Sequence, residues 1–229
     1  MSKDIIIKTE GLGKCYRDPE EKWVVKDVEL SIAKGEFVSV VGRSGSGKST
    51  LLKMMGGLLK PEAGRVLIGT DDIYKFSAKA MADYRCNRIG FVFQDYFLEE
   101  KYTVYQNVEV VLMIAKVDVK KRKDLVSKAL MLVGMEDKKD SYVKNLSGGE
   151  KQRVCIARAI VNDPDIIYAD EPCGNLDYEN GANIMRILRE LTEKGKTVVL
   201  ITHNREDAAN TDRIITLQDG KVIADEVKG

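Results

Sequence analysis

A glycine-rich stretch that follows an apolar strand pattern is the feature that most constrains the fold. The segment GRSGSGKST at 42–50 comes directly after FVSVV at 37–41, and a helical pattern begins at Ser49. The spacing fits G-x-x-x-x-G-K-[ST], in which glycines let backbone N–H groups surround an anion and the next helix points its N-terminus at it. A chance glycine- and serine-rich turn would not need this strand and helix around it. The sequence therefore predicts a phosphate-binding loop.

Two side chains of this loop carry specific chemistry. Lys48 places a positive charge beside the terminal phosphates of a bound nucleotide, and Ser49 offers a hydroxyl to Mg²⁺. The expected nucleotide-binding residues of the loop are Gly42, Arg43, Ser44, Gly45, Ser46, Gly47, Lys48, Ser49 and Thr50.

Two neighbouring acids end a second apolar strand pattern, IIYADE at 166–171. Carboxylates at the end of a buried strand are costly unless a cation or hydrogen bonds satisfy them. Parallel sheets bind ligands at the carboxyl ends of their strands, so Asp170 suits the Mg²⁺ shell. Glu171 can accept a proton from an attacking water. The alternative is a solvated acidic turn before Pro172, which the phosphate loop upstream makes less attractive.

A second glycine-rich turn, NLSGGEKQR at 145–153, opens a helical pattern that stops before Pro164. Ser147, Gly148 and Gly149 at a helix N-terminus predict another anion-binding turn. His203 ends the apolar strand pattern TVVLITH, where it is either a structural residue or a donor to phosphate oxygens. The sequence leaves these two interpretations of His203 open.

Composition excludes several classes of function. The chain has 229 residues with 37 Lys+Arg and 36 Asp+Glu, and this balance gives no electrostatic case for nucleic acid. No apolar run approaches the roughly 18–20 residues of a membrane span, so any membrane role is expected to come through a partner. Four scattered cysteines and a single histidine argue against zinc sites and Ser–His triads.

The order of patterns along the chain predicts one domain, 1–229, of class α/β. The first forty residues resemble consecutive strands, which favours antiparallel pairing. The stretch from about 95 to 160 is mainly helical, with Leu125, Ala129 and Val133 among the apolar residues on one helix face. Strand and helix patterns then alternate, which is typical of a parallel sheet covered by helices.

The motifs together resemble an ATP-binding cassette (ABC) protein. They occur in that family's order along nearly the whole chain: GRSGSGKST, Gln94 ending FVFQ, LSGGEKQR, IIYADE, NLD at 175–177 and His203. The resemblance implies a P-loop NTPase (RecA-like) core with an antiparallel β subdomain and a helical subdomain. It also implies ATP and Mg²⁺ as cofactors.

The resemblance implies a role for each motif. Two copies would pair head to tail with two ATP molecules between them, and Asp177 would lie at the dimer interface. Glu171 would be the general base, with Lys48 and His203 on the γ-phosphate. Tyr16 would stack on adenine. The metal-binding residues would be Ser49, Gln94 and Asp170, and the partner's ATP would meet the signature turn formed by Ser147, Gly148, Gly149 and Glu150.

The resemblance also implies integral membrane permease subunits as partners, which would place the chain at the cytoplasmic face of the cell membrane. The stretch EPCGNLD is similar to cassettes of lipoprotein release, macrolide export, cell-division signalling and antimicrobial peptide resistance, although Cys173 replaces their usual Thr and Cys155 their usual Ala. One alternative is a soluble ABC-type ATPase acting on nucleic acid or ribosomes. Another is a nucleotide kinase, in which the signature turn, Gln94 and His203 would have no role.

Overall fold

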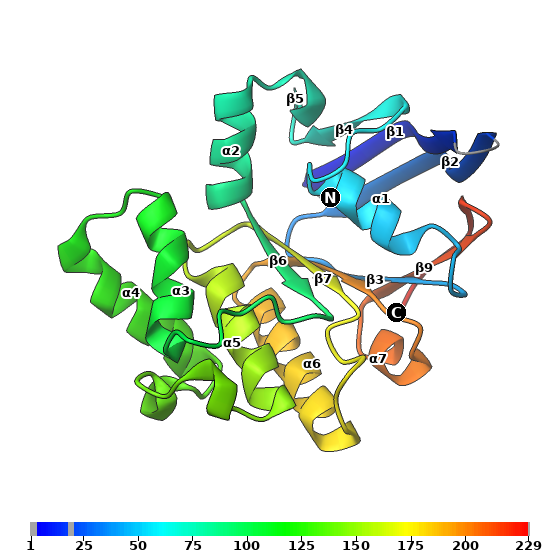
Figure 1. Cartoon of the computed structure of the whole chain (residues 1–229). Helices are drawn as coiled ribbons and strands as arrows, with labels where there is room; N and C mark the ends of the chain where they lie inside the picture. Colours follow the sequence, from blue (N-terminus) through cyan, green and yellow to red (C-terminus); the bar gives the residue numbers. More distant parts are fainter. Residues whose placement is uncertain (1–3, 18–20, 229) are drawn as a thin grey trace.

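The computed structural model describes residues 4–17 and 21–228, which form two β-sheets with helices packed against them (Figure 1). The larger sheet has the strand order β10-β9-β3-β8-β7-β6. The bounds of its strands are β3 (Phe37–Val41), β6 (Ile89–Phe93), β7 (Ile166–Asp170), β8 (Thr197–Ile201), β9 (Arg213–Gln218) and β10 (Lys221–Val227). The strands from β9 to β6 in this order run parallel, and β10 pairs antiparallel with β9.

Helices cover both faces of the larger sheet, and each face has its own apolar cluster. Along β7, Ile167 and Ala169 belong to one cluster, whereas Ile166 and Tyr168 belong to the other, because successive side chains of a strand point to opposite faces. The covering helices are α1 (Lys48–Met55), α2 (Ala78–Asn87), α5 (Gly148–Ile160), α6 (Tyr178–Glu193) and α7 (Arg205–Ala209). Burial on both faces explains why the parallel strands are almost continuously apolar.

The smaller sheet is antiparallel, as the closely spaced strand patterns of the first forty residues predict. Its strand order is β2-β1-β4-β5. The bounds are β1 (Ile5–Arg17), β2 (Glu21–Ala33), β4 (Ala63–Ile68) and β5 (Asp71–Asp72), followed by the 3₁₀ turn η1 (Ile73–Lys75). Figure 1 shows this sheet packed beside α1, and its buried side chains share a cluster with Leu51 and Leu52 of that helix.

The helices between β6 and β7 form a separate group, seen in green in Figure 1. It contains α3 (Val104–Ile114), α4 (Val119–Leu132), two 3₁₀ turns, η2 (Glu136–Lys138) and η3 (Val143–Asn145), and α5. The face of α4 with Val126, Ala129 and Leu130 is buried, in agreement with the predicted periodicity. We propose that residues 95–160 form a helical subdomain inserted in the RecA-like core of a single domain.

The strand register brings four loops to one edge of the larger sheet. Asp170 of β7 lies opposite Ile201 of β8 and Phe93 of β6, and Val40 of β3 is also opposite Ile201. The segments that follow β3, β6, β7 and β8 therefore emerge side by side. These segments are the ones that hold the predicted phosphate loop, Gln94, Glu171 and His203.

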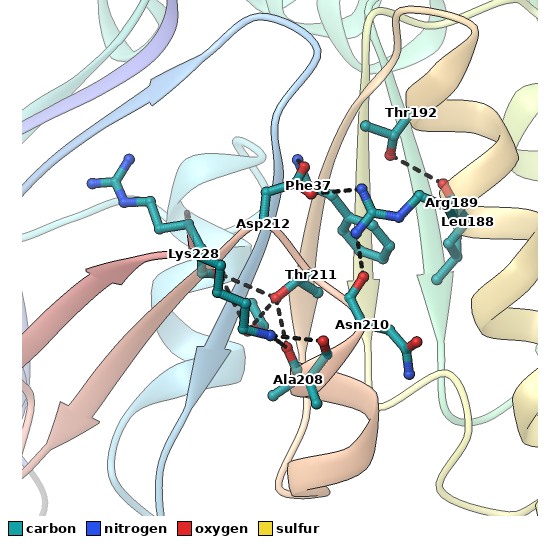
Figure 2. A network of polar contacts seen from close by, with 12 residues as sticks. Phe37, Leu188, Arg189, Thr192, Ala208, Asn210, Thr211, Asp212 and Lys228 are labelled. Carbon is teal, nitrogen blue, oxygen red and sulfur yellow. Dashed lines mark hydrogen bonds and ion pairs between the residues drawn. The ribbon is translucent and has the colours of Figure 1, made fainter.

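A polar network lies at the start of β3, at the opposite end of this strand from the phosphate loop (Figure 2). Arg189 of α6 donates to Asp212 at 2.6 Å, and its guanidinium lies 5.0 Å from the ring centroid of Phe37. Asp212 accepts a hydrogen bond from the backbone N–H of Phe37, and Lys228 donates to the carbonyl oxygen of Ala208 at the end of α7. Asp212 thus links the start of β3 to α6, and Lys228, whose backbone N–H donates to the carbonyl oxygen of Asp212, extends the network to α7.

Among the residues that the structure describes, no helix combines the length and the apolarity that crossing a membrane requires.

Candidate nucleotide-binding site

A cavity of 520 Å³ opens at the edge where the four loops meet. Most of its walls come from the predicted site residues Ser44, Gly45, Gly47, Lys48, Ser49, Thr50, Gln94, Glu171 and His203, with Val24 of β2 beside them. Motifs that are more than 150 residues apart in the sequence therefore face one space, as the prediction of a single nucleotide site requires.

The phosphate loop depends on glycine where it enters α1. Gly47 is the N-cap of α1 with a left-handed φ of 87°, and a Cβ at this position would lie 2.1 Å from the carbonyl oxygen of Val24. The Lys48 ammonium donates to the carbonyl oxygens of Gly42 at 3.0 Å and Arg43 at 3.4 Å, which holds it over the loop. The loop thus combines a helix N-terminus with a positioned cation, the arrangement that favours phosphate.

Ser49 and Asp170 form the part of the site that suits a divalent cation. The Ser49 hydroxyl donates to Asp170 Oδ1 at 2.9 Å. Burial raises the pKa of the Asp170 carboxyl, while the Ser49 hydroxyl and the Lys53 ammonium act in the opposite direction. A half-buried carboxylate beside a hydroxyl offers the hard oxygen donors that Mg²⁺ prefers, with phosphates and waters completing its shell. In the part of the chain that the structure describes, no cluster of three or more His, Cys, Asp or Glu residues could hold a metal alone.

Glu171 and His203 meet at the mouth of the same cavity. The Oε2 atom of Glu171 lies 2.8 Å from Nδ1 of His203, although the two residues follow different strands. Glu171 has a left-handed φ of 50°, and its backbone N–H donates to the carbonyl oxygen of Ile201. Such a conformation is costly for a side chain larger than glycine and is typical of functional sites. The contact favours the functional interpretation of His203.

Gln94 enters the cavity from the end of β6 and contacts the NLD segment. Its Nε2 donates to Oδ1 of Asn175 at 3.2 Å, and Asn175 Nδ2 donates back to the carbonyl oxygen of Gln94 at 3.4 Å. A Cβ on Gly174 would lie 2.8 Å from Gln94 Nε2, so this glycine allows the close approach. Sequence reasoning named Asn175 only as part of the NLD motif and missed its pairing with Gln94 and the role of Gly174, because no local pattern indicates this contact.

The second glycine turn lies outside this cavity, since none of its residues contributes to the walls. Ser147 is the N-cap of α5 and forms a capping box with Glu150, whose Oε2 accepts from the Ser147 N–H at 2.9 Å. The Lys138 ammonium lowers the pKa of the Glu150 carboxyl. The S-x-x-E spacing in the sequence signals this capping box. Glu150 therefore stabilises the turn. Gly148 has no side chain, so it does not cover the N-terminus of α5.

Polar side chains along one face of α5 hold the segment after Gln94. Cys155 donates to the carbonyl oxygen of Tyr96 at 3.1 Å, and Arg158 donates to those of Tyr96 at 2.9 Å and Phe97 at 2.5 Å. Burial raises the pKa of the Cys155 thiol to about 12, so this cysteine is a neutral packing residue. Burial raises the pKa of Cys173 to about 12 as well.

Tyr16 and Asp177 do not line the cavity. Tyr16 lies near the end of β1 with 46% of its surface exposed, and the Lys14 ammonium is 5.6 Å from its ring centroid. Asp177 is the N-cap of α6, and both of its carboxylate oxygens accept from the side-chain amide of Asn180. Both side chains remain accessible for contacts outside their own chain.

Comparison with known families decides what this arrangement is. The family model described as ABC transporter matches residues 25–174. The chain belongs to the ABC transporter family. Its cassette is 41% identical to the macrolide export ATP-binding/permease protein MacB of Shewanella oneidensis, over 93% of this chain and 33% of that protein. It is also 41% identical to the uncharacterized ABC transporter ATP-binding protein YvrO of Bacillus subtilis, over 96% of this chain and 97% of that protein.

Solved ABC cassettes share the fold along nearly the whole chain. The dimeric post-hydrolysis structure of the cassette MJ0796 bound to ADP and Pi has a TM-score of 0.90 and 38% identity, covering 98% of this chain and 100% of that chain. CbiO1 of Clostridium perfringens, part of the transporter complex cbiONQ, has a TM-score of 0.90 and 33% identity, covering 98% and 89%. The predicted family, P-loop NTPase fold and ATPase activity are confirmed. The cassette spans about a third of the length of the MacB relatives.

Proposed function

We propose that two copies of this cassette bind ATP head to tail and that their closing and reopening drive permease subunits in the membrane. The observation that carries the proposal is the position of the signature turn, Ser147–Glu150. The turn has the form of an anion site but lies outside the ATP cavity of its own chain. The dimeric structures reported for MJ0796 support a second copy as the source of the missing phosphate.

Each residue around the cavity has a task in this proposal. Lys48 and His203 hold the γ-phosphate, and Glu171 accepts the proton of the attacking water. Ser49, Gln94 and Asp170 hold Mg²⁺, which when bound neutralises charge on the phosphate oxygens. The hydrogen bond to His203 orients the Glu171 carboxylate toward the cavity mouth. Asp177 would cross to the second copy.

Tyr16 provides a test of where adenine binds. Tyr16 is an exposed aromatic ring opposite Lys22 of β2, the strand that brings Val24 to the cavity wall. Such a ring suits base stacking, which contributes about 1–3 kcal/mol. We expect Tyr16→Ala to weaken ATP binding by roughly 10-fold, and Tyr16→Phe to leave it unchanged because the ring is kept. Titration with a fluorescent ATP analogue measures both. Equal affinity of the Ala variant and the wild type would place adenine elsewhere.

An exposed apolar surface supports a membrane protein as the second partner. Val110, Met113 and Ile114 lie on one face of α3 by their i, i+3 and i+4 spacing, and they are 38%, 53% and 68% exposed. Phe97, in the segment held by α5, is 69% exposed. Exposed apolar side chains gathered on one helix face mark an interaction site. We propose that the permease docks here, which would place the cassette at the cytoplasmic face of the membrane.

Ile114→Asp tests this docking surface. The side chain is exposed, so we expect the variant to fold and to keep its intrinsic ATPase activity. Its recovery with the permease should fall at least about 10-fold, because a charge at an apolar contact must be desolvated. Co-purification from membranes measures the loss. Ile223→Asp is the matched control, since Ile223 is 58% exposed on β10, away from α3. Loss of permease in both variants would contradict the assignment.

The relatives support a proposal for the type of transporter. The MacB relatives are named for macrolide export and carry ATP-binding and permease parts in one protein. Together with the EPCGNLD stretch, this supports export, lipoprotein release or antimicrobial peptide resistance as the process that the cassette powers. The near-neutral net charge gives no electrostatic support for a nucleic-acid partner.

A further inference from the structure

A second cavity of 440 Å³ lies at the opposite edge of the larger sheet from the ATP cavity. The ATP cavity is lined by segments that follow the parallel strands, whereas Pro164 and Lys196 of this cavity directly precede β7 and β8. Its other walls come from α4, the end of α5 and the end of α6. It therefore lies between the helical group and the sheet, and none of its residues has a task in ATP hydrolysis.

The floor of this cavity is apolar. Ile167 of β7 is fully buried, and Leu125, Leu132 and Ile160 around it are only partly buried. Protein interiors are close-packed, so a space of this size between apolar side chains leaves their contacts incomplete. Its volume is within the range of roughly 300–1,000 Å³ that is typical of small-molecule sites. An apolar body of a ligand would complete these contacts.

The rim of the cavity is cationic. Lys128, Lys194 and Lys196 line it together with a single acid, Asp163. Asp163 is paired with Lys196 at 2.6 Å, and 89% of its side chain is exposed. Within the described ranges, no carboxylate lies within 4 Å of the Lys128 or Lys194 ammonium. Two exposed lysines without such a partner thus stand at the mouth of an apolar space.

We propose that this cavity binds a small amphipathic anion, with its apolar body against Leu125, Leu132 and Ile160 and its anionic group between Lys128 and Lys194. An uncharged apolar molecule would gain the floor contacts but not the rim. A cation would be repelled by both lysines. The ligand class is therefore an alkyl or aryl carboxylate, sulfonate or phosphate, and the site is independent of the ATP chemistry.

The test compares three probes that share one alkyl chain and differ in charge. Decanoate and decyltrimethylammonium are titrated by calorimetry below their micelle concentrations, and decanol is titrated below its solubility limit. We expect decanoate to bind one site per chain and at least about 10-fold more tightly than decyltrimethylammonium, because the two exposed lysines attract the anion and repel the cation. In a Lys128→Glu, Lys194→Glu double variant, decanoate should lose this advantage and decyltrimethylammonium should bind more tightly.

A Lys79→Glu, Lys221→Glu double variant is the matched control. It changes the net charge by the same amount at exposed lysines outside the cavity. We expect it to keep the wild-type preference for decanoate, with thermal midpoints of both double variants close to the wild type. Absence of saturable decanoate binding to the wild type overturns the proposal. So does an equal loss of decanoate binding in both double variants, since that would reflect net charge instead of this site.

Discussion

Glu171→Gln is expected to give a cassette that binds ATP, forms a lasting dimer and turns over at least about 100-fold more slowly than the wild type. Glutamine has the shape of glutamate and can still hydrogen-bond His203, but its amide cannot accept a proton from water. General bases typically contribute about 10²–10⁴ in rate. Steady-state phosphate release measures the turnover, and size-exclusion chromatography with ATP measures the dimer.

The matched control for this variant is Glu206→Gln on α7. Glu206 also follows β8, yet its carboxylate does not line the cavity. We expect wild-type turnover and no lasting dimer for this control. Wild-type turnover of Glu171→Gln would show that another group accepts the proton, and the assignment of Glu171 would then be wrong.

The second large effect is expected for Gly148→Asp. The first residue of α5 lies where backbone N–H groups converge, so an added carboxylate would occupy or repel the phosphate of the second copy. Like charges about 4 Å apart at a protein surface repel by roughly 4 kcal/mol. The ATP-dependent dimer should weaken at least about 100-fold, while ATP binding to the isolated chain stays unchanged because the turn lies outside its own cavity.

The substitution itself should leave the fold intact. An acid in the first turn stabilises a helix. A Cβ at Gly148 would lie 2.9 Å from the Tyr96 hydroxyl, which must shift slightly, and in ordinary contact with Leu176 at 3.6 Å. Gly148→Ala is the control, because it adds the same Cβ without charge and should still dimerise. Gly149 is unsuitable for this test, since its Cβ would lie 2.1 Å from Asn180 Oδ1. Loss of ATP binding by monomeric Gly148→Asp would mean that the turn serves its own nucleotide.

Local patterns predicted much of the fold. The phosphate loop is encoded within nine residues, and the apolar strands before Asp170 and His203 place their ends at one edge once the sheet is parallel. The burial of Val126, Ala129 and Leu130 on one face of α4 likewise follows from periodicity alone. These features depend on neighbours in the sequence, so composition and spacing are sufficient to detect them.

Contacts between distant segments could not be predicted in this way. Gln94 pairs with Asn175 and Arg158 binds the carbonyls of Tyr96 and Phe97, across 81 and about 60 residues. Both interactions involve backbone atoms or side-chain amides, which have no sequence signature. They appear only when packing brings α5 and the NLD segment against the end of β6 and the residues that follow it. The second cavity is equally a product of packing between α4, α5 and α6.

The attachment of α5 to the segment after Gln94 has a consequence for how two copies would communicate. In the proposed dimer, one end of this helix would present Gly148 to the ATP of the partner, while Arg158 near its other end holds Tyr96 and Phe97, which follow Gln94 of the chain's own ATP cavity. A helix of 13 residues is about 20 Å long, so a tilt of a few degrees at Arg158 moves Gly148 by roughly 1 Å. In such a dimer, occupancy of one cavity would be transmitted to the geometry of the other, and the two ATP molecules would be sensed cooperatively.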